Sequence, residues 1–338
     1  MESEKTYYIA VTPNSAYIAY TTVLLQSLFE TNPGKQFCFY IVYNALRQEE
    51  MDTVTQYALK YGARVEFLYV DGERYKDFPS SQRLTVETYF RLEIQELLPE
   101  YVERLLYLDC DMIICRDIDE LYNMDFEEKY IAACGYSTKL ESGGEFNAGM
   151  LMMNLKKMRK DGITFDTYRK LAEQLNGNYY MDQGLLNELY AENGTKYVWK
   201  QKYNFTCPFY RKFREKLKTE MPDYTLEDVT VMHFAGPGLR PWQASISREE
   251  FEQLKKRNLL DIFAANGWII DEVYIRFLEK WWDFAERTPY AKELTADMNA
   301  KKNEIYAKVL GAVIDSKEYS LGYSLMRLPR KIKQFIRK

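Results

Sequence analysis

Two aspartates interrupt an apolar stretch of the sequence and are the first residues whose types could do chemistry. The stretch reads LLYLDCDMIIC over residues 105–115, with Asp109 and Asp111 two positions apart. In an extended chain, residues i and i+2 point to the same side. Two partly desolvated carboxylates side by side are unfavourable unless a cation lies between them or one is protonated. Their position after an apolar strand favours a divalent metal site; a polar turn between two strands is the plain alternative.

The only histidine, His233, begins the segment HFAGPGLRPW. A single histidine near an apolar strand is more often a hydrogen-bonded core residue than a metal ligand, but the residues that follow it here favour a ligand. Gly236 and Gly238 would let backbone N–H groups approach an anion, and Arg240 can bind a phosphate through two parallel hydrogen bonds. Two carboxylates and one imidazole, completed by two phosphate oxygens, suit an octahedral Mn²⁺ or Mg²⁺.

Strands and helices alternate along the first third of the chain. The patterns predict strands over residues 7–11, 37–43, 64–70 and 105–108, and helices over 16–29, 48–61 and 85–98. Such alternation indicates βαβ units and a mainly parallel sheet, in which ligands gather beyond the carboxyl ends of the strands. The first strand-to-helix turn, VTPNSA, contains no glycine, and no Walker loop is present. NAD enzymes and P-loop NTPases are therefore excluded.

Length and composition predict one large globular domain with an appendage, or two modest domains. Of 338 residues, 46% are hydrophobic, and the net charge of −4 argues against a general nucleic-acid binder. After about Asp261 the pattern becomes helical, which predicts a catalytic α/β domain over 1–265 and a helical extension over 266–338.

Several sequence features together predict a cytoplasmic protein. The five cysteines form no Cys-x-x-Cys pair, which favours buried thiols in a reducing compartment. No signal peptide is expected at Met1–Lys5, and no apolar run approaches the roughly 20 residues of a membrane-spanning helix.

Five motifs in order make the sequence resemble glycosyltransferase family 8, the retaining enzymes that include bacterial lipopolysaccharide galactosyltransferases and glycogenin. The motifs are TYFRL (88–92), LLYLDCDMII (105–114), FNAGMLMMNL (146–155), MDQGLLN (181–187) and HFAGPGLRPW (233–242). The resemblance implies a GT-A type fold. It also implies hexosyl transfer from UDP-glucose or UDP-galactose to a glycan or lipid-linked acceptor, with Mn²⁺ or Mg²⁺ as cofactor.

The resemblance also implies roles for individual residues. Asp109, Asp111 and His233 match the metal ligands. Gln183 matches a side chain beneath the anomeric carbon, and Asp182 an aspartate that holds the hydroxyls of the transferred sugar. The residues matched to donor binding are Ala10, Asn14, Tyr17, Arg91, Asp109, Cys110, Asn147, Ala148, Asp182, Gly236, Gly238 and Arg240.

Plain structural interpretations stand beside these roles. Asn147-Ala148-Gly149 could be a simple turn, Asp182 could cap a following helix, and Arg91 could form a surface ion pair with Glu87 worth little.

Two residues depart from the family pattern. Asn14 replaces an acidic residue that contacts the base in better-known members, and Arg240 replaces a lysine. A non-catalytic sugar-nucleotide or glycan binder and a sugar nucleotidyltransferase are the alternative functions. The second would need a glycine-rich basic loop after the first strand, where this chain has none.

The C-terminal residues form a separate signal. Residues 319–338 contain six basic and no acidic side chains, with apolar residues at helical spacing. This composition predicts a basic amphipathic segment on the inner, anionic face of the cell membrane; a helix packed on the catalytic domain is the alternative.

Overall fold

The computed structural model of the chain describes residues 5–79, 85–137, 144–236 and 238–314. The chain divides into two compact units, Met1–Ala235 with Phe284–Ala291, and Gly236–Asp283 with Lys292–Lys338. This division reflects packing density and does not decide where an independently folding domain ends. The predicted boundary between residues 265 and 266 therefore stays a prediction.

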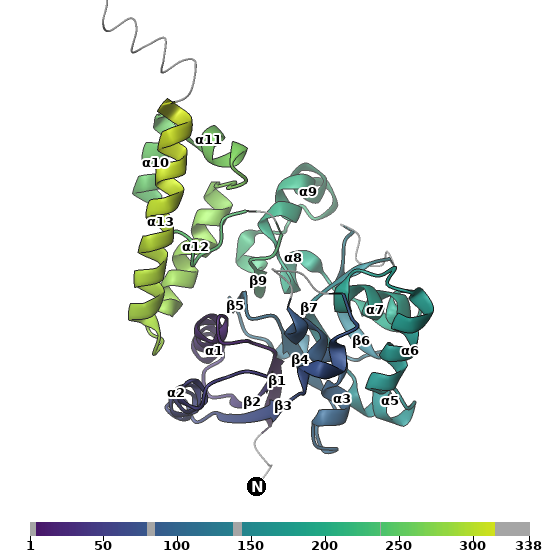
Figure 1. Cartoon of the computed structure of the whole chain (residues 1–338). Coiled ribbons are helices and arrows are strands. Elements are labelled where there is room, and N and C mark those ends of the chain that lie inside the picture. Colours follow the sequence, from purple (N-terminus) through teal and green to yellow (C-terminus); the bar gives the residue numbers. More distant parts are fainter. Residues whose placement is uncertain (1–4, 80–84, 138–143, 237, 315–338) are drawn as a thin grey trace, which may run out of the picture. The chain divides into compact units, whose positions relative to one another are not determined.

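A seven-stranded mixed sheet forms the centre of the first unit (Figure 1). Its strands are β1 (Thr6–Val11), β2 (Gln36–Tyr43), β3 (Arg64–Tyr69), β4 (Leu105–Leu108), β6 (Ile131–Gly135), β7 (Phe146–Met153) and β8 (Thr195–Tyr197), in the order β3-β2-β1-β4-β7-β6-β8. The strands from β3 to β4 are parallel, whereas β7 runs antiparallel to both β4 and β6. A separate antiparallel pair joins β5 (Met112–Ile114) to β9 (Val231–His233).

Helices cover both faces of this sheet. Alternate strand residues enter different cores: Ile9 and Leu108 pack with α1 (Ile18–Thr31) and α2 (Gln48–Leu59), whereas Ala10 and Tyr107 enter the opposite core. The opposite core also holds residues of the 3₁₀ helix η2 (Val86–Leu92) and of α3 (Ile94–Leu97), α5 (Leu155–Lys160), α6 (Phe165–Leu175) and α7 (Met181–Tyr190). This two-layer burial confirms the predicted α/β class.

The prediction of one continuous helix over residues 85–98 is wrong. The segment is the 3₁₀ helix η2 followed by the single turn α3, with Glu93 between them. Tyr89, Phe90 and Arg91 are all buried, so the segment has no solvent face of the kind an amphipathic α-helix requires. Tertiary contacts therefore outweigh helix propensity here, and the tighter helix results.

The strand order reverses between β1 and β4. From β1 the chain proceeds outward through β2 and β3, and it then returns to add β4 on the other side of β1. The carboxyl ends of these two neighbouring parallel strands lie at the same edge of the sheet, at the position where open α/β sheets bind ligands. Asp109 follows β4 directly at this edge.

One long helix, α9, and several short elements complete the described part of the first unit. They are the 3₁₀ helices η1 (Gly72–Tyr75) and η3 (Leu226–Asp228), and the helices α4 (Asp119–Tyr122), α8 (Lys200–Tyr203) and α9 (Cys207–Glu220).

The second unit holds α10 (Arg248–Lys256), α11 (Leu260–Ala265) and most of α12 (Glu272–Ala285) and α13 (Ala291–Ile314). Trp281 is fully buried within it, beside Trp242. In the described part of the chain after residue 260 only helices occur, as predicted. Within the described ranges, no helix combines the length and apolarity needed to cross a bilayer.

Candidate active site

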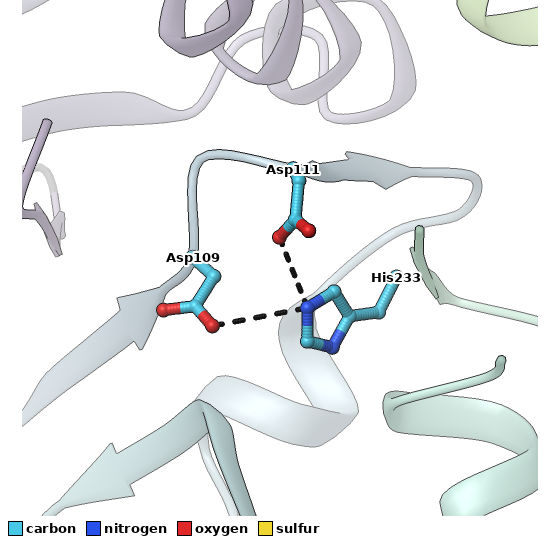
Figure 2. Close-up of side chains that lie close together, drawn as sticks. All are labelled: Asp109, Asp111 and His233. Carbon is cyan, nitrogen blue, oxygen red and sulfur yellow. Dashed lines mark ion pairs between the residues drawn. The ribbon is translucent and has the colours of Figure 1, made fainter. Parts of the chain in front are cut away.

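Asp109 and Asp111 lie in the turn that joins β4 to β5. The Asp109 N–H donates to the Gly149 carbonyl of the neighbouring strand β7 at 2.8 Å, and Asp111 directly precedes β5. The chain is therefore not extended through Asp-Cys-Asp, and the expectation that an extended backbone aligns the two side chains is wrong. Both carboxylates nevertheless face one point, because the turn presents them to the same histidine (Figure 2).

His233 reaches the two aspartates through strand pairing. It ends β9, where it stands opposite Met112 of β5, and its ring is buried. Its Nε2 lies 3.0 Å from Asp111 Oδ1 and 3.8 Å from Asp109 Oδ2. One ligand atom from each of the three residues lies within 4.8 Å of the others. Two oxygens and one imidazole nitrogen so gathered could hold a divalent metal ion.

Gly149 of β7 lies so close to this cluster that a side chain at this position would clash with it. A Cβ built on it would lie 2.5 Å from His233 Cε1 and 2.7 Å from Asp109 Oδ2, closer than side-chain atoms approach one another. The backbone of β7 therefore passes directly beneath the cluster, and only glycine permits that approach.

Arg91 is a buried cation that joins the cluster to Asp182. Its guanidinium lies 3.0 Å from Asp109 Oδ1 and 3.0 Å from Asp182 Oδ2, and Nη1 donates to the Ala148 carbonyl at 2.5 Å. Burial alone would lower the pKa of Arg91, but Asp109 and Asp182 outweigh it and raise that pKa above its ordinary value. The alternative of a surface ion pair with Glu87 is wrong.

Asp182 lies in the first turn of α7 and is almost fully buried. Tyr180, not Asp182, occupies the N-cap position of that helix. Burial raises the pKa of Asp182 to about 6, although Arg91 opposes the rise. The Nε–H of Arg91 is directed to the Thr88 carbonyl at 2.9 Å, so its contact with Asp182 Oδ2 is an ion pair without an aligned hydrogen bond. That oxygen keeps hydrogen-bonding capacity.

Asn147, Ala148 and Gly149 belong to strand β7, so the alternative of a simple turn is wrong. Asn147 Nδ2 and the Ala148 N–H both donate to Gln183 Oε1, each at 3.2 Å. Gln183 in α7 is therefore held against the start of β7, on the side of the sheet that carries Arg91 and Asp182.

The remaining first-unit residues matched to donor binding lie around the end of β1 and the turn after β4. Ala10 is buried in β1. Cys110 is buried too, and its burial raises the pKa of the thiol to about 12. Asn14 Nδ2 donates to Thr85 Oγ1 at 3.4 Å, while its buried Oδ1 has no hydrogen-bond partner within the described ranges. Tyr17 precedes α1, is 36% exposed and meets Tyr20 edge-on.

Gly236, Gly238 and Arg240 lie in the second unit. Both glycines have a positive φ, +86° and +142°, which L-residues with side chains adopt only under strain. The Arg240 N–H donates to Gln243 Oε1 at 2.8 Å. The expected contact of this loop with a phosphate stays a prediction.

Sequence reasoning missed two residues that orient the cluster. Tyr107 donates to Asp109 Oδ1 at 2.9 Å and also contacts Thr12 Oγ1 at 3.0 Å. Asn204 Oδ1 lies 2.9 Å from His233 Nδ1. Tyr107 could have been suspected from its place in β4, two residues before Asp109. Asn204 carries no such signal, because it is distant in sequence from the other residues of the site.

Comparisons with known proteins show similar sequences and structures. Residues 8–245 match the family described as glycosyl transferase family 8. A lipopolysaccharide 1,2-glucosyltransferase of Escherichia coli is 23% identical over 72% of this chain and 75% of its own length. A lipopolysaccharide 1,3-galactosyltransferase of Salmonella typhimurium is 26% identical over 66% of this chain and 68% of its own length.

Solved structures show the same fold. The galactosyltransferase LgtC, in complex with donor and acceptor sugar analogues, superposes with a TM-score of 0.63 at 22% identity, covering 83% of this chain and 96% of LgtC. The glycosyltransferase GlyE of Streptococcus pneumoniae gives a TM-score of 0.60 at 21% identity, over 88% of this chain and 63% of GlyE. The predicted GT-A fold is confirmed.

Proposed function

The chain belongs to glycosyl transferase family 8, and from this premise we propose that it transfers a hexose, glucose or galactose, from a UDP-sugar to a glycan or lipid-linked acceptor with retention of configuration. Glycosyltransferase activity follows from the family. The hexose, the UDP carrier and the acceptor are proposals, supported by relatives named for glucosyl and galactosyl transfer to lipopolysaccharide. The main support for the proposal is that the side chains of Asp109, Asp111 and His233 lie close together at the carboxyl end of β4.

The donor set of this cluster fits Mn²⁺, with Mg²⁺ as the alternative. Oxygen ligands suit either ion, and the imidazole nitrogen favours the transition metal. Because Gly149 has no side chain, β7 adds no Cβ atom against His233 and Asp109. Arg91 balances part of the negative charge of Asp109 and leaves its other oxygen, Oδ2, toward His233. When bound, the metal would neutralise charge that builds on the departing diphosphate.

The buried acid–base pair beside the cluster would orient the transferred sugar. Arg91 holds Asp182 by charge, and Asp182 Oδ2, which has no hydrogen-bond partner among the described residues, could accept a hydrogen bond from a sugar hydroxyl. An interaction of this kind fixes the sugar relative to the leaving group before reaction. In the second unit, Arg240 and the backbone of Gly236 and Gly238 are the proposed phosphate contacts.

Gln183 is proposed to face the anomeric carbon and to stabilise positive charge there through its carbonyl oxygen. In the structure that oxygen already accepts the N–H groups of Asn147 and Ala148, both at 3.2 Å. Hydrogen bonds of this length lie at the weak end of the usual range. The proposed role therefore requires one of them to open when donor binds.

Retention without a covalent intermediate is the expected stereochemical course. An amide such as Gln183 is a poor nucleophile, and the nearby carboxylate of Asp182 is buried against Arg91. We therefore expect front-side attack through an oxocarbenium-like state. Proton NMR of the fresh product should show the small anomeric coupling of an α-linkage, and a β-linked first product would overturn the assignment. Gln183→Ala should lower kcat and leave UDP affinity nearly unchanged, since its contact strengthens in the transition state.

Thermal unfolding with UDP tests the site directly. A ligand at 100 times its Kd stabilises the native state by about 2.7 kcal/mol. UDP with Mn²⁺ should therefore raise the Tm far more than UDP with a chelator, and Asp111→Asn should lose the difference. Equal shifts in both conditions would contradict the proposed metal site. A panel of UDP-sugars scored for UDP release, with and without glycan acceptors, then separates a transferase from a non-catalytic binder, which would bind without releasing UDP.

A further inference from the structure

A chain of side-chain amides runs from His233 to Gln183. Asn204 Oδ1 lies 2.9 Å from His233 Nδ1, and Asn204 Nδ2 donates to Asn147 Oδ1 at 2.7 Å. Asn147 Nδ2 in turn donates to Gln183 Oε1 at 3.2 Å. The chain thus connects the histidine of the proposed metal site with the residue proposed to face the anomeric carbon.

Two backbone N–H groups of β7 fix the direction of every amide in this chain. A backbone N–H can only donate, so the Asn147 atom facing the Gly149 N–H at 3.2 Å must be its oxygen. The Ala148 N–H in the same way requires the oxygen of Gln183. With its oxygen fixed, Asn147 accepts a second hydrogen bond from the Asn204 NH₂ group, and this leaves Asn204 only its oxygen to present to His233.

The orientation of Asn204 determines which nitrogen of His233 carries the proton. An amide oxygen can only accept, so Nδ1 must be the protonated nitrogen of the ring. The neutral ring then has its lone pair on Nε2, which is the nitrogen that faces Asp109 and Asp111. A metal ion needs this lone pair, and an outer partner on the other ring nitrogen is how proteins usually fix it.

We propose that Asn204 is a positioning residue: it holds His233 in the Nδ1–H tautomer and in the rotamer that aims Nε2 at the metal site, and Asn147 keeps Asn204 from turning over. The proposal deepens the proposed function and rests on it for the metal. The protonation of Nδ1 follows from the contact with the Asn204 oxygen and does not depend on the metal.

The backbone of Asn204 is held independently of its side chain. Asn204 is fully buried at the end of α8, and the following residue, Phe205, pairs with β9: its N–H donates to the Val231 carbonyl, and its carbonyl accepts the His233 N–H at 2.8 Å. Substitution of the Asn204 side chain therefore removes the contact with the ring while these main-chain hydrogen bonds hold the segment in place.

The single histidine makes the tautomer directly measurable. In protein labelled with ¹⁵N-histidine, long-range proton–nitrogen correlation reports one imidazole only. Metal-free protein at alkaline pH should show the proton on Nδ1. Asn204→Leu should move it to Nε2, because Asp111 Oδ1 at 3.0 Å is then the remaining acceptor. A wild-type ring protonated on Nε2, or an unchanged tautomer in Asn204→Leu, overturns the proposal.

Metal affinity supplies the second readout, measured from the electron paramagnetic resonance of free Mn²⁺ in the presence of UDP. Asn204→Leu should weaken Mn²⁺ binding about 10- to 100-fold, the usual effect of losing an outer partner of a ligand. Asn204→Asp should bind Mn²⁺ more tightly than Asn204→Leu, because a carboxylate still accepts the Nδ1–H, although its second oxygen then faces the Asn147 oxygen. In a His233→Ala background, Asn204→Leu should cost no more than a further factor of about two.

Controls separate this role from general destabilisation. Asn154 caps α5 and bonds only backbone groups, with its oxygen accepting the Lys157 N–H and its nitrogen donating to the Lys129 carbonyl. Asn154→Leu should lower the Tm and change neither the histidine spectrum nor Mn²⁺ affinity. Asn204 would have a merely structural role if Asn204→Asp bound Mn²⁺ as weakly as Asn204→Leu. The same conclusion would follow if Asn204→Leu weakened Mn²⁺ binding in the His233→Ala background as much as it does in wild type. If wild type did not bind Mn²⁺, the proposed function would be refuted. The tautomer of the metal-free protein would still test the positioning role of Asn204.

Discussion

Replacement of Gly149 by alanine tests the side-chain cluster sharply, because it adds one methyl group and no charge. The new Cβ would lie 2.5 Å from His233 Cε1 and 2.7 Å from Asp109 Oδ2. Ordinary van der Waals contact begins at about 3.4 Å, so the ring must withdraw by roughly 0.9 Å and the carboxylate by roughly 0.7 Å.

Neither group can withdraw freely. His233 is tied to Asn204, and Asp109 is held by Arg91 at 3.0 Å and by Tyr107 at 2.9 Å. Metal–ligand distances tolerate changes of only about 0.2 Å. We therefore expect Gly149→Ala to lose at least one ligand and about 100-fold in Mn²⁺ affinity, which corresponds to about 2.7 kcal/mol. Overpacking should also lower folding stability by about 1–3 kcal/mol.

The assay is Mn²⁺ binding in the presence of UDP, together with the Tm of the metal-free protein. Gly194→Ala is the matched control, because its Cβ would lie 2.6 Å from Tyr190 Cδ1, a clash of similar size against residues outside the candidate site. This control should melt earlier and bind Mn²⁺ as wild type does. If Gly149→Ala bound Mn²⁺ with wild-type affinity, the assignment of Asp109 and His233 as ligands of one ion would be refuted.

Three further expectations concern pH and membranes. Burial raises the pKa of Asp182 to about 6, so the native state holds this proton at a higher pH than the unfolded state does. The free energy of unfolding of the metal-free protein should therefore fall by about 3 kcal/mol as pH rises from about 4 to 6. Asp182→Asn should abolish this pH dependence in thermal melts. Burial lowers the pKa of Lys200 to about 8, so the free energy of unfolding should fall by about 3 kcal/mol as pH falls from about 10.5 to 8. Lys200→Met should melt at a higher temperature than wild type at pH 7 and should not show this pH dependence. If residues 319–338 bind membranes, the full chain should co-sediment with anionic liposomes at low salt and dissociate as salt rises, whereas a chain ending near residue 319 should not bind. That segment lies outside the described residues.

Local sequence patterns were sufficient to place three of the parallel strands. The predicted strands 37–43, 64–70 and 105–108 agree with β2, β3 and β4 to within one residue at each end. Residues 37–43 and 105–108 are short runs of apolar or aromatic residues, which can bury both faces of a parallel strand. Residues 64–70 include Arg64 and Glu66, and they form the partly exposed edge strand β3. The segment 85–98 was misassigned because the form of its backbone depends on burial among elements that are distant in sequence.

The candidate chemistry could be inferred from local features of the amino-acid sequence. The two aspartates after an apolar strand, the single histidine and the order of five motifs are enough to indicate a metal-dependent glycosyltransferase. Membership in glycosyl transferase family 8 confirms the enzyme class. These signals are readable because each lies within one short segment, where strand periodicity and residue type are local properties.

The way in which those segments meet depends on the three-dimensional fold. The pairing of β5 with β9 brings His233 to Asp111, and the pairing of β4 with β7 passes Gly149 beneath Asp109. The environment of Arg91, buried between two carboxylates, and the contact of Asn204 with the histidine ring also depend on this assembly. Periodicity within a segment specifies which side chains share a face, but it carries no information about which distant segment will cover that face or in what register. The ligand set could therefore be proposed from sequence, while its orientation could not.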